Sequence, residues 1–337
     1  MRRERIRVRI GKGGGGNYFA APNTSLEFIP SGCKVLDLAL GGGWVENRII
    51  NIVGDKSTGK TLLCIEASAN FARKYPKGKI LYREAEAAFD PGYAKAIGMP
   101  IDRVDSDKPL ETVEDLFEDL TEVVKNAKGP VLYICDSLDA LSDRAEVVRD
   151  MDQGSYGAEK AKKLSQLFRR LIRLMANKQV TMIIVSQVRD KIGLSFGRKT
   201  TRSGGKALDF YASQVVYLAH IGILARVVSN RKLPSGVIVR AKLDKNKVGL
   251  PFREAQFQIM FGYGIDDVTA CVEYIKEIGA LKQADIKESE IKGYSRRLMR
   301  GSAEDELYET DRLRKFVEKR WYEIEKSLLP QRTKYGA

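Results

Sequence analysis

The sequence predicts an α/β protein with a mainly parallel sheet and helices on both of its faces. From Ile49 onward, short apolar runs rich in β-branched residues alternate with longer helical stretches. This alternation is typical of parallel sheets, because consecutive parallel strands need a crossover connection that is usually a helix. The chain has 337 residues, of which 43% are apolar, and this is enough for one large packed domain with an appendage. A wholly disordered chain is therefore excluded.

The expected elements follow in chain order. Apolar runs predict strands, the stretches between them predict helices, and charged helices after about Ile265 predict a small C-terminal subdomain. We therefore divide the chain into a basic glycine-rich arm over 1–24, a core over 25–267 and a helical region over 268–337. The strands are expected at 49–53, 79–83, 131–135 and 182–186, and the helices at 60–74, 112–127, 158–177, 268–280 and 303–328.

Cysteine content, histidine content and hydropathy disfavour several classes of protein. The four cysteines are far apart in the sequence, and the single histidine is His220, which disfavours a disulfide scaffold and a structural zinc site. A reducing cytosol fits best. No run of about 18 apolar residues is present, so no membrane span is expected. The formal net charge of +14 suits a polyanionic partner, either nucleic acid or an anionic membrane surface, unless it serves solubility alone.

The excess positive charge is concentrated in two segments. Residues 1–16 carry six basic side chains against Glu4, and Arg5 to Ile10 alternates basic and apolar residues before a glycine-rich hinge. This arm is either a solvated tail or a strand that adds to another subunit or lies on phosphates. Residues 158–206 carry thirteen basic side chains against two acidic ones. Localised charge of this kind indicates a phosphate-binding track.

A phosphate-binding loop follows the first predicted core strand. The sequence GDKSTGKT lies between a strand and a helix, which is the required context for the GxxxxGK[ST] pattern. Such a loop turns backbone N–H groups toward an anion at a helix N-terminus. Lys60 is expected to reach the β- and γ-phosphates of a nucleotide, and Thr61 to hold Mg²⁺; the alternative is a glycine-rich turn with a solvated lysine. The predicted nucleotide-binding residues are Gly54, Asp55, Lys56, Ser57, Thr58, Gly59, Lys60 and Thr61.

Polar residues that follow neighbouring strands predict the rest of an ATPase site. Asp136 ends an apolar run, where it is expected to orient Mg²⁺. Glu84, Glu86 and Asp90 follow another strand, and each is a candidate for the base that activates water. Gln187 ends a third strand, where its amide is placed to sense a γ-phosphate. All of these positions belong to the carboxyl edge of the predicted sheet, where ligands bind in open α/β folds.

Seven blocks of sequence, spread along the core, form one ordered pattern. They are IPSGCKVLDLALGGG, GDKSTGKT, EAEAAFDPGYAKAIG, VLYICDSLDAL, VSQVRDKIGLSFG, SGGKALDFYAS and KNKVGLPFREAQFQIMFGYGID. In this order they resemble the core of RecA-type DNA recombinases, a family that includes bacterial RecA and phage UvsX-like proteins. The resemblance covers roughly residues 25–280 and implies a RecA-like P-loop ATPase core. It is far more specific than a lone phosphate-binding loop.

The resemblance implies roles for individual residues. Glu86 matches the catalytic glutamate that activates water, and Gln187 matches the glutamine that couples the γ-phosphate to the DNA-binding loop behind it. Lys245 and Lys247 match lysines that reach the ATP of the neighbouring subunit; the alternative for them is a basic turn between strands. If the match holds, hydrolysis requires assembly. Asp90 and Tyr93 match positions that contact adenine, and Phe261 matches an aromatic position near the nucleotide.

Two glycine-containing segments match the DNA-binding loops of the family, about 149–157 and 190–206. Tyr156 and Ile192 match side chains that wedge against bases; loop packing is the alternative for either. Cations and backbone N–H groups would hold phosphates while a wedge opens a base step, so binding is expected to be independent of sequence. The other residues expected to contact DNA are Arg198, Lys199, Thr201, Arg202, Ser203, Gly204 and Gly205.

Taken together, the resemblance implies an ATP-dependent homologous recombinase with ATP and Mg²⁺ as cofactors. Such a protein would polymerise as a helical filament on single-stranded DNA and exchange strands with a homologous duplex. It would also interact with single-strand-binding and loader proteins. A RecA-fold motor or helicase and an ATP-binding recombination mediator are the alternatives. The two ends depart from bacterial RecA, since a basic arm replaces the docking helix and the final residues, KSLLPQRTKYGA, are basic rather than acidic.

Overall fold

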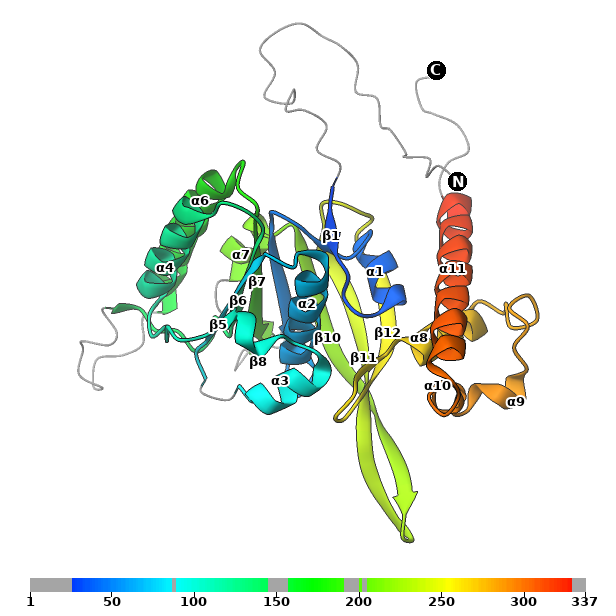
Figure 1. Cartoon of the computed structure of the whole chain (residues 1–337). Helices are drawn as coiled ribbons and strands as arrows, with labels where there is room; N and C mark the ends of the chain where they lie inside the picture. The colour runs from blue at the N-terminus through cyan, green and yellow to red at the C-terminus, as the bar shows by residue number, and fades with distance from the viewer. Residues whose placement is uncertain (1–25, 87–88, 145–156, 191–199, 202–204, 329–337) are drawn as a thin grey trace, which may run out of the picture.

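A single large sheet organises the fold (Figure 1). This computed structural model describes residues 26–86, 89–144, 157–190, 200–201 and 205–328. Among these residues the sheet has nine strands, of which five neighbouring pairs are parallel and three antiparallel, so the predicted mainly parallel sheet is confirmed. In spatial order the strands are β13 (Gly264–Asp266), β12 (Glu254–Met260), β11 (Arg231–Asn246), β10 (Gln214–Val228), β3 (Ile49–Gly54), β7 (Val180–Gln187), β6 (Val131–Asp136), β4 (Lys79–Glu84) and β5 (Val104–Asp105).

The parallel half of the sheet contains the strands that the sequence predicts. β3 and β6 are buried along their whole length, which explains why their sequences are continuous apolar runs instead of alternating ones. In register, Gly54 lies opposite Gln187, and Glu84 lies opposite Asp136. The carboxyl ends of β3, β7, β6 and β4 therefore meet at one edge of the sheet.

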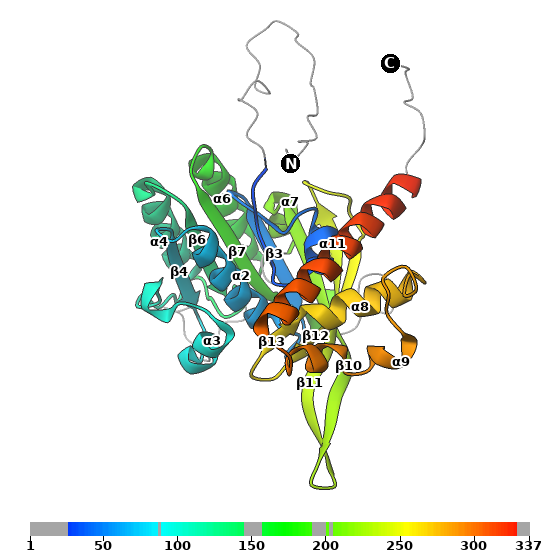
Figure 2. The same cartoon turned by 45° about the vertical axis from the view of Figure 1, so that its right-hand side comes forward.

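The antiparallel half continues from β10, which pairs in parallel with β3 and antiparallel with β11. β10 and β11 extend beyond the sheet as a long hairpin (Figures 1 and 2). The two turn residues, Ser229 and Asn230, both have positive φ, as the tight hairpin turns that suit strand twist require. Two short ladders complete the strands: β1 (Phe28–Ile29) with β2 (Trp44–Val45), and β8 (Arg189–Asp190) with β9 (Thr200–Thr201).

Helices cover both faces of the sheet, as predicted. Alternate residues of β3 separate the two cores, because Ile50 and Ile52 belong to one apolar cluster while Ile49 and Val53 belong to the other. The first cluster includes α1 (Lys34–Leu40), α2 (Lys60–Lys74), α3 (Pro91–Ile97), α8 (Asp267–Glu277) and α11 (Ala303–Leu328). The second includes α4 (Val113–Asn126), α6 (Gly157–Met175) and α7 (Gly205–Tyr211), and the short helices η1 (Ile101–Arg103), α9 (Glu288–Ile291) and α10 (Tyr294–Leu298) complete the described elements.

Local sequence sets several helix boundaries. The predicted helix at 60–74 coincides with α2. α4 begins after Thr112, whose hydroxyl accepts a hydrogen bond from the Asp115 N–H at 3.1 Å, while the Asp115 carboxylate accepts one from the Thr112 N–H at 2.9 Å. This reciprocal capping box satisfies two backbone donors at the helix start.

The C-terminal helices pack on the core. Along α11, Leu313, Val317 and Trp321 recur every four residues and are buried in the same apolar cluster as α1 and α8. The Trp321 and Tyr274 rings lie with their centroids 5.5 Å apart. Figure 2 shows α11 crossing beside α8 in front of the sheet. Within the described ranges, no helix is both long and apolar enough to cross a membrane.

Removing the Trp321 side chain tests this packing. Trp321 is 7% exposed, so Trp321→Ala leaves a cavity between α11 and α8 and is expected to lower the free energy of unfolding by about 3–5 kcal/mol. Tyr322, the next residue, is 56% exposed, and Tyr322→Ala should change it by no more than about 0.5 kcal/mol. Urea denaturation followed by circular dichroism measures both; equal effects would contradict the packing described for α11.

Candidate functional site

The phosphate-binding loop connects β3 to α2. Gly59 has φ of +88°, and a Cβ at that position would lie 2.4 Å from Cδ1 of Ile259 in β12. A Cβ at Gly54 would lie 2.5 Å from the hydroxyl oxygen of Thr58 within the same loop. Only glycine fits at these two positions, because one needs a left-handed backbone and both are crowded. The loop therefore presents its backbone at the N-terminus of a 15-residue helix, an arrangement that binds anions.

Lys60, the first residue of α2, is buried beside this loop. Its Nζ donates a hydrogen bond to the carbonyl oxygen of Asp55 at 2.6 Å. Burial lowers the pKa of Lys60, and the carboxylates of Asp136 and Glu86 act in the opposite direction. A phosphate group would give this buried ammonium a negative partner, which favours its charged form.

Thr61 and Asp136 bring oxygen atoms together at the end of β6. The Thr61 hydroxyl donates to Oδ2 of Asp136 at 2.8 Å, and the Tyr82 hydroxyl donates to the same oxygen at 2.7 Å. Burial raises the pKa of Asp136, and these two hydrogen bonds oppose the rise. A hydroxyl and a carboxylate are ligands that Mg²⁺ prefers, and a bound cation would offset the cost of burying the carboxylate. The residues present therefore fit a Mg²⁺ ion.

Glu86 lies at the same edge and links two other strands. Its Oε1 accepts hydrogen bonds from the Ser137 hydroxyl at 2.5 Å and from the Gln187 side-chain amide at 2.7 Å. Gln187 is held in turn by Asp139, whose carboxylate accepts a hydrogen bond from the Gln187 backbone N–H at 2.6 Å. The nearby Glu84 makes a local contact, because its carboxylate accepts a hydrogen bond from the Glu86 N–H at 2.9 Å.

Asp90, Tyr93 and Phe261 are the positions matched to residues near the nucleotide. Asp90 caps α3, and its carboxylate accepts a hydrogen bond from the Tyr93 N–H at 3.0 Å. Tyr93 is half-buried, and burial followed by the nearby Glu66 of α2 raises its pKa. Phe261 is 59% exposed and follows Ile259, the residue that lies against Gly59, by two positions. Asp90 and Tyr93 are thus held near α2, and Phe261 near the loop.

Lys245 and Lys247 lie at the opposite edge of the sheet. The Lys247 N–H donates to the Ser213 carbonyl at 2.9 Å, and the Ser213 N–H donates to the carbonyl of Ile49, the first residue of β3, at 2.7 Å. The phosphate-binding loop begins at the other end of β3. Gly54 is five residues after Ile49, which corresponds to about 17 Å along the strand. Lys245 Nζ donates to the carbonyl of Phe210 in α7 at 2.8 Å, and also to that of Asp209. The structure does not bring these lysines to the phosphate-binding loop of their own chain.

The predicted DNA-contacting residues are described only in part. Thr201 lies in β9 and pairs with Arg189 of β8, and Gly205 is the first residue of α7. The second predicted DNA loop, 190–206, therefore begins in the β8–β9 ladder and ends in α7. These elements provide hydrogen-bond partners for backbone groups at the two ends of the loop. The residues outside the described ranges are Tyr156, Ile192, Arg198, Lys199, Arg202, Ser203 and Gly204.

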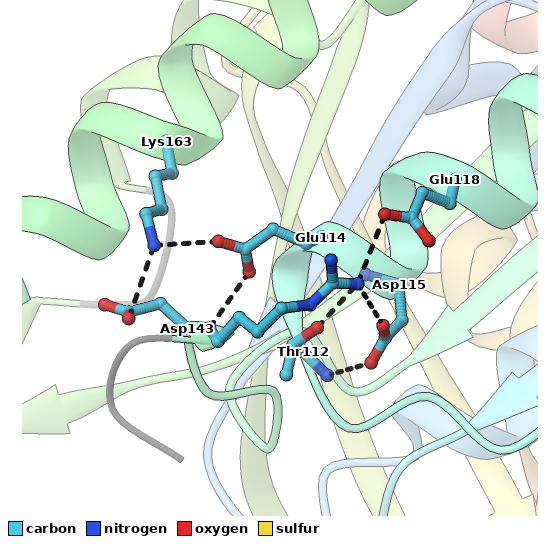
Figure 3. Close-up of polar contacts among 7 residues, drawn as sticks. Thr112, Glu114, Asp115, Glu118, Asp143 and Lys163 are labelled. Carbon is cyan, nitrogen blue, oxygen red and sulfur yellow. Dashed lines mark hydrogen bonds and ion pairs between the residues drawn. The ribbon is translucent and has the colours of Figure 1, made fainter. Parts of the chain in front are cut away.

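Part of the positive charge between 158 and 206 is paired within the chain. Lys163 of α6 lies 2.7 Å from the Glu114 carboxylate and 3.4 Å from that of Asp143 (Figure 3). Arg144 is paired with Asp115 at 2.8 Å, in the first turn of α4. These contacts tie the chain on both sides of 145–156 to α4. The charge of Lys163 is therefore paired with carboxylates outside the basic segment, and this lysine has a structural role.

Three residues that sequence reasoning did not single out contribute to the site. Ser137 and Asp139 come one and three positions after Asp136. Their place just beyond a predicted strand end could have identified them as candidate site residues. Tyr82 lies within an apolar run, and only the packing of β4 against β6 brings its hydroxyl to Asp136.

Known proteins are similar in sequence to this chain over most of its length. A sequence model of the RecA N-terminal domain matches residues 3–266. The chain is similar to Protein RecA of Nostoc punctiforme, with 36% identity over 276 residues, which cover 82% of this chain and 74% of that protein. It is similar to Protein RecA of a Nocardioides species, 36% identical over 83% of this chain and 77% of that protein, and of Streptomyces avermitilis, 34% identical over 83% and 72%.

Replacing Lys60 tests nucleotide binding by the loop. Lys60→Ala removes the buried ammonium while leaving the glycines intact, and it should weaken the affinity for ATP on the order of 100-fold. Lys56, in the same loop, is exposed, and Lys56→Ala keeps the backbone N–H and should change the affinity by less than about threefold. Isothermal titration calorimetry with ATP and Mg²⁺ compares the two; unchanged binding by Lys60→Ala would place the nucleotide elsewhere.

Proposed function

This chain belongs to the RecA family of DNA recombinases, and on that premise we propose how its sheet edge couples ATP hydrolysis to DNA binding. As a member of this family the protein is a nucleotide-binding, DNA-dependent ATPase. The observation that carries the proposal is the hydrogen bond between the Gln187 amide and Glu86, which joins the ATPase edge to the strand leading into 190–206. We place the reaction in the cytosol, where the four free, buried cysteines stay reduced.

The nucleotide is held by the loop and by α2. Lys60 binds the β- and γ-phosphates, and Thr61 and Asp136 hold Mg²⁺, which neutralises charge on the phosphates during transfer. Asp90 and Tyr93 contact the adenine, and Phe261 lies near the nucleotide. The buried ammonium of Lys60 and the buried carboxylate of Asp136 support this assignment, because each gains an oppositely charged partner.

Glu86 acts as the base that takes a proton from the attacking water. Two donors, Ser137 and Gln187, share its Oε1 and hold the carboxylate in place. When the Gln187 amide turns to a γ-phosphate oxygen, Oε1 of Glu86 loses one donor and is open to accept a hydrogen bond from water. The same rotation of the Gln187 amide thus depends on the presence of a γ-phosphate and makes Glu86 accessible to the attacking water.

Gln187 also connects the nucleotide to DNA. It is the last residue of β7. Arg189 of β8, two positions after Gln187, pairs with Thr201 of β9. A displacement of Gln187 is therefore passed to the start of the predicted second DNA loop and, across the ladder, to Thr201 within it. This loop and the segment around Tyr156 hold single-stranded DNA through phosphates and base wedges, leaving base edges free to pair with a homologous duplex.

The ATPase site is completed between subunits. Lys245 and Lys247 lie at the edge of the sheet opposite their own phosphate-binding loop, which supports a role at the nucleotide of a neighbouring copy. Copies joined head to tail in this way repeat without closing and form a helical filament on DNA. Single-strand-binding and loader proteins are further proposed partners.

Strand exchange between circular single-stranded DNA and a homologous linear duplex tests the proposed function. With ATP and Mg²⁺ the protein should form joint molecules and nicked circles, and electron micrographs should show helical filaments. A DNA motor would hydrolyse ATP and unwind DNA without forming joint molecules. A mediator would bind ATP and DNA but exchange nothing. Either of these results would overturn the proposal.

Exchanging the proposed base tests its assignment. Glu86→Gln keeps the shape and should bind ATP normally, lower DNA-stimulated turnover at least ~100-fold and lengthen the residence time on DNA. Glu84→Gln is the matched control, because Glu84 was an equal candidate on sequence grounds; it should retain turnover within about threefold. A phosphate-release assay decides, and normal turnover by Glu86→Gln would assign the base elsewhere.

The pH dependence of turnover tests the role of Lys245. Burial and the neighbouring Lys247 lower the pKa of Lys245 to about 8, so its charge is present at pH 7 and is lost as the pH rises toward 9. DNA-stimulated turnover should therefore fall up to about tenfold over this interval, while Lys245→Arg, which stays charged, should fall much less. Lys242→Arg, whose lysine is paired with Glu254, is the control and should follow the wild-type profile. Identical profiles for all three proteins would remove Lys245 from the reaction.

A further inference from the structure

Tyr82 is a fully buried residue of β4 whose hydroxyl reaches the proposed metal site. This hydroxyl donates a hydrogen bond to Oδ2 of Asp136 at 2.7 Å, and the Thr61 hydroxyl donates to the same oxygen at 2.8 Å. A buried tyrosine hydroxyl needs a polar partner, and here the partner is the carboxylate itself. Tyr82 thus approaches Asp136 from the neighbouring strand, whereas Thr61 approaches from α2.

The ring of Tyr82 has a second contact, separate from that of its hydroxyl. Its centroid lies 4.6 Å from that of Phe89, with 37° between the ring planes. Phe89 precedes Asp90, the residue that caps α3. The ring therefore packs against the segment that follows Glu86, while the hydroxyl faces the carboxylate that ends β6. These two contacts can be altered independently by substitution.

We propose that Tyr82 is a positioning residue that holds the Asp136 carboxylate in the orientation needed to bind Mg²⁺. A carboxylate at a strand end is otherwise free to rotate, and a donor on one oxygen fixes which oxygen faces the cation. Outer hydrogen-bond partners of this kind commonly contribute 10–100-fold to metal affinity. Thr61 also donates to this oxygen, but its hydroxyl is itself a proposed metal ligand, so Tyr82 is the donor to Asp136 whose proposed role is orientation alone. The inference rests on the proposed function, since it assumes that Asp136 serves Mg²⁺.

The test compares two buried tyrosines whose hydroxyls donate to different carboxylates. Tyr82→Phe removes only the hydroxyl, and Tyr133→Phe is the matched control, because Tyr133 is also fully buried and donates to a buried carboxylate, Asp119, at 2.8 Å. The affinity for a fluorescent ADP analogue is measured with EDTA and with increasing Mg²⁺. Tyr82→Phe should raise the Mg²⁺ concentration needed for half-maximal gain in affinity by roughly 10-fold, with the affinity in EDTA unchanged within about twofold. Tyr133→Phe should match the wild type in both.

Further variants and measurements keep the outcomes distinct. Phe89→Leu alters the ring contact and keeps the hydroxyl, so it should leave the Mg²⁺ dependence unchanged; an effect equal to that of Tyr82→Phe would replace the proposed positioning by general packing. Urea denaturation shows whether each variant is folded. Equal Mg²⁺ dependence in Tyr82→Phe and Tyr133→Phe would overturn the inference while leaving the proposed function intact. If the nucleotide affinity of the wild-type protein does not depend on Mg²⁺, the assignment of Asp136 itself is overturned.

Discussion

The proposed nucleotide site depends on one constraint, the parallel register of β3, β7, β6 and β4. Because these strands run in the same direction, their carboxyl ends meet at a single edge, where Gly54 lies opposite Gln187 and Glu84 opposite Asp136. A slip of one residue would turn these side chains to the other face of the sheet. Register is specified by burial of apolar residues on both faces, so the packing of the core sets the geometry of the polar edge.

At that edge, two carboxylate oxygens each accept two side-chain donors. Oδ2 of Asp136 accepts from Thr61 and Tyr82, and Oε1 of Glu86 accepts from Ser137 and Gln187. Each carboxylate is thereby joined to elements other than its own. A ligand that takes one donor away changes the charge stabilisation of the carboxylate that loses it. This sharing gives the edge a physical means of responding to a nucleotide.

The two edges of the sheet have different roles in the proposed assembly. The carboxyl edge holds the phosphate-binding loop, and the amino edge holds Lys245 and Lys247, so one chain presents the two parts of the site about a strand length apart. A rigid sheet cannot fold these parts together, and in the proposed filament a second copy supplies the missing one. On this proposal, the separation that requires a second chain for activity also lets copies repeat along DNA.

The sequence by itself determined the features that depend on neighbours along the chain. These are the phosphate-binding loop over 54–61, the buried strand runs and helix bounds such as those of α2, because local patterns and glycine geometry specify them. The tertiary structure decided what depends on distant residues. It produced the antiparallel β10–β11 hairpin, and it joined Glu86, left equal to Glu84 and Asp90 by the residues alone, to side chains 51 and 101 positions away. It also brought Tyr82, which an apolar run conceals, to Asp136, because hydrogen bonds across strands follow from register and not from spacing along the chain.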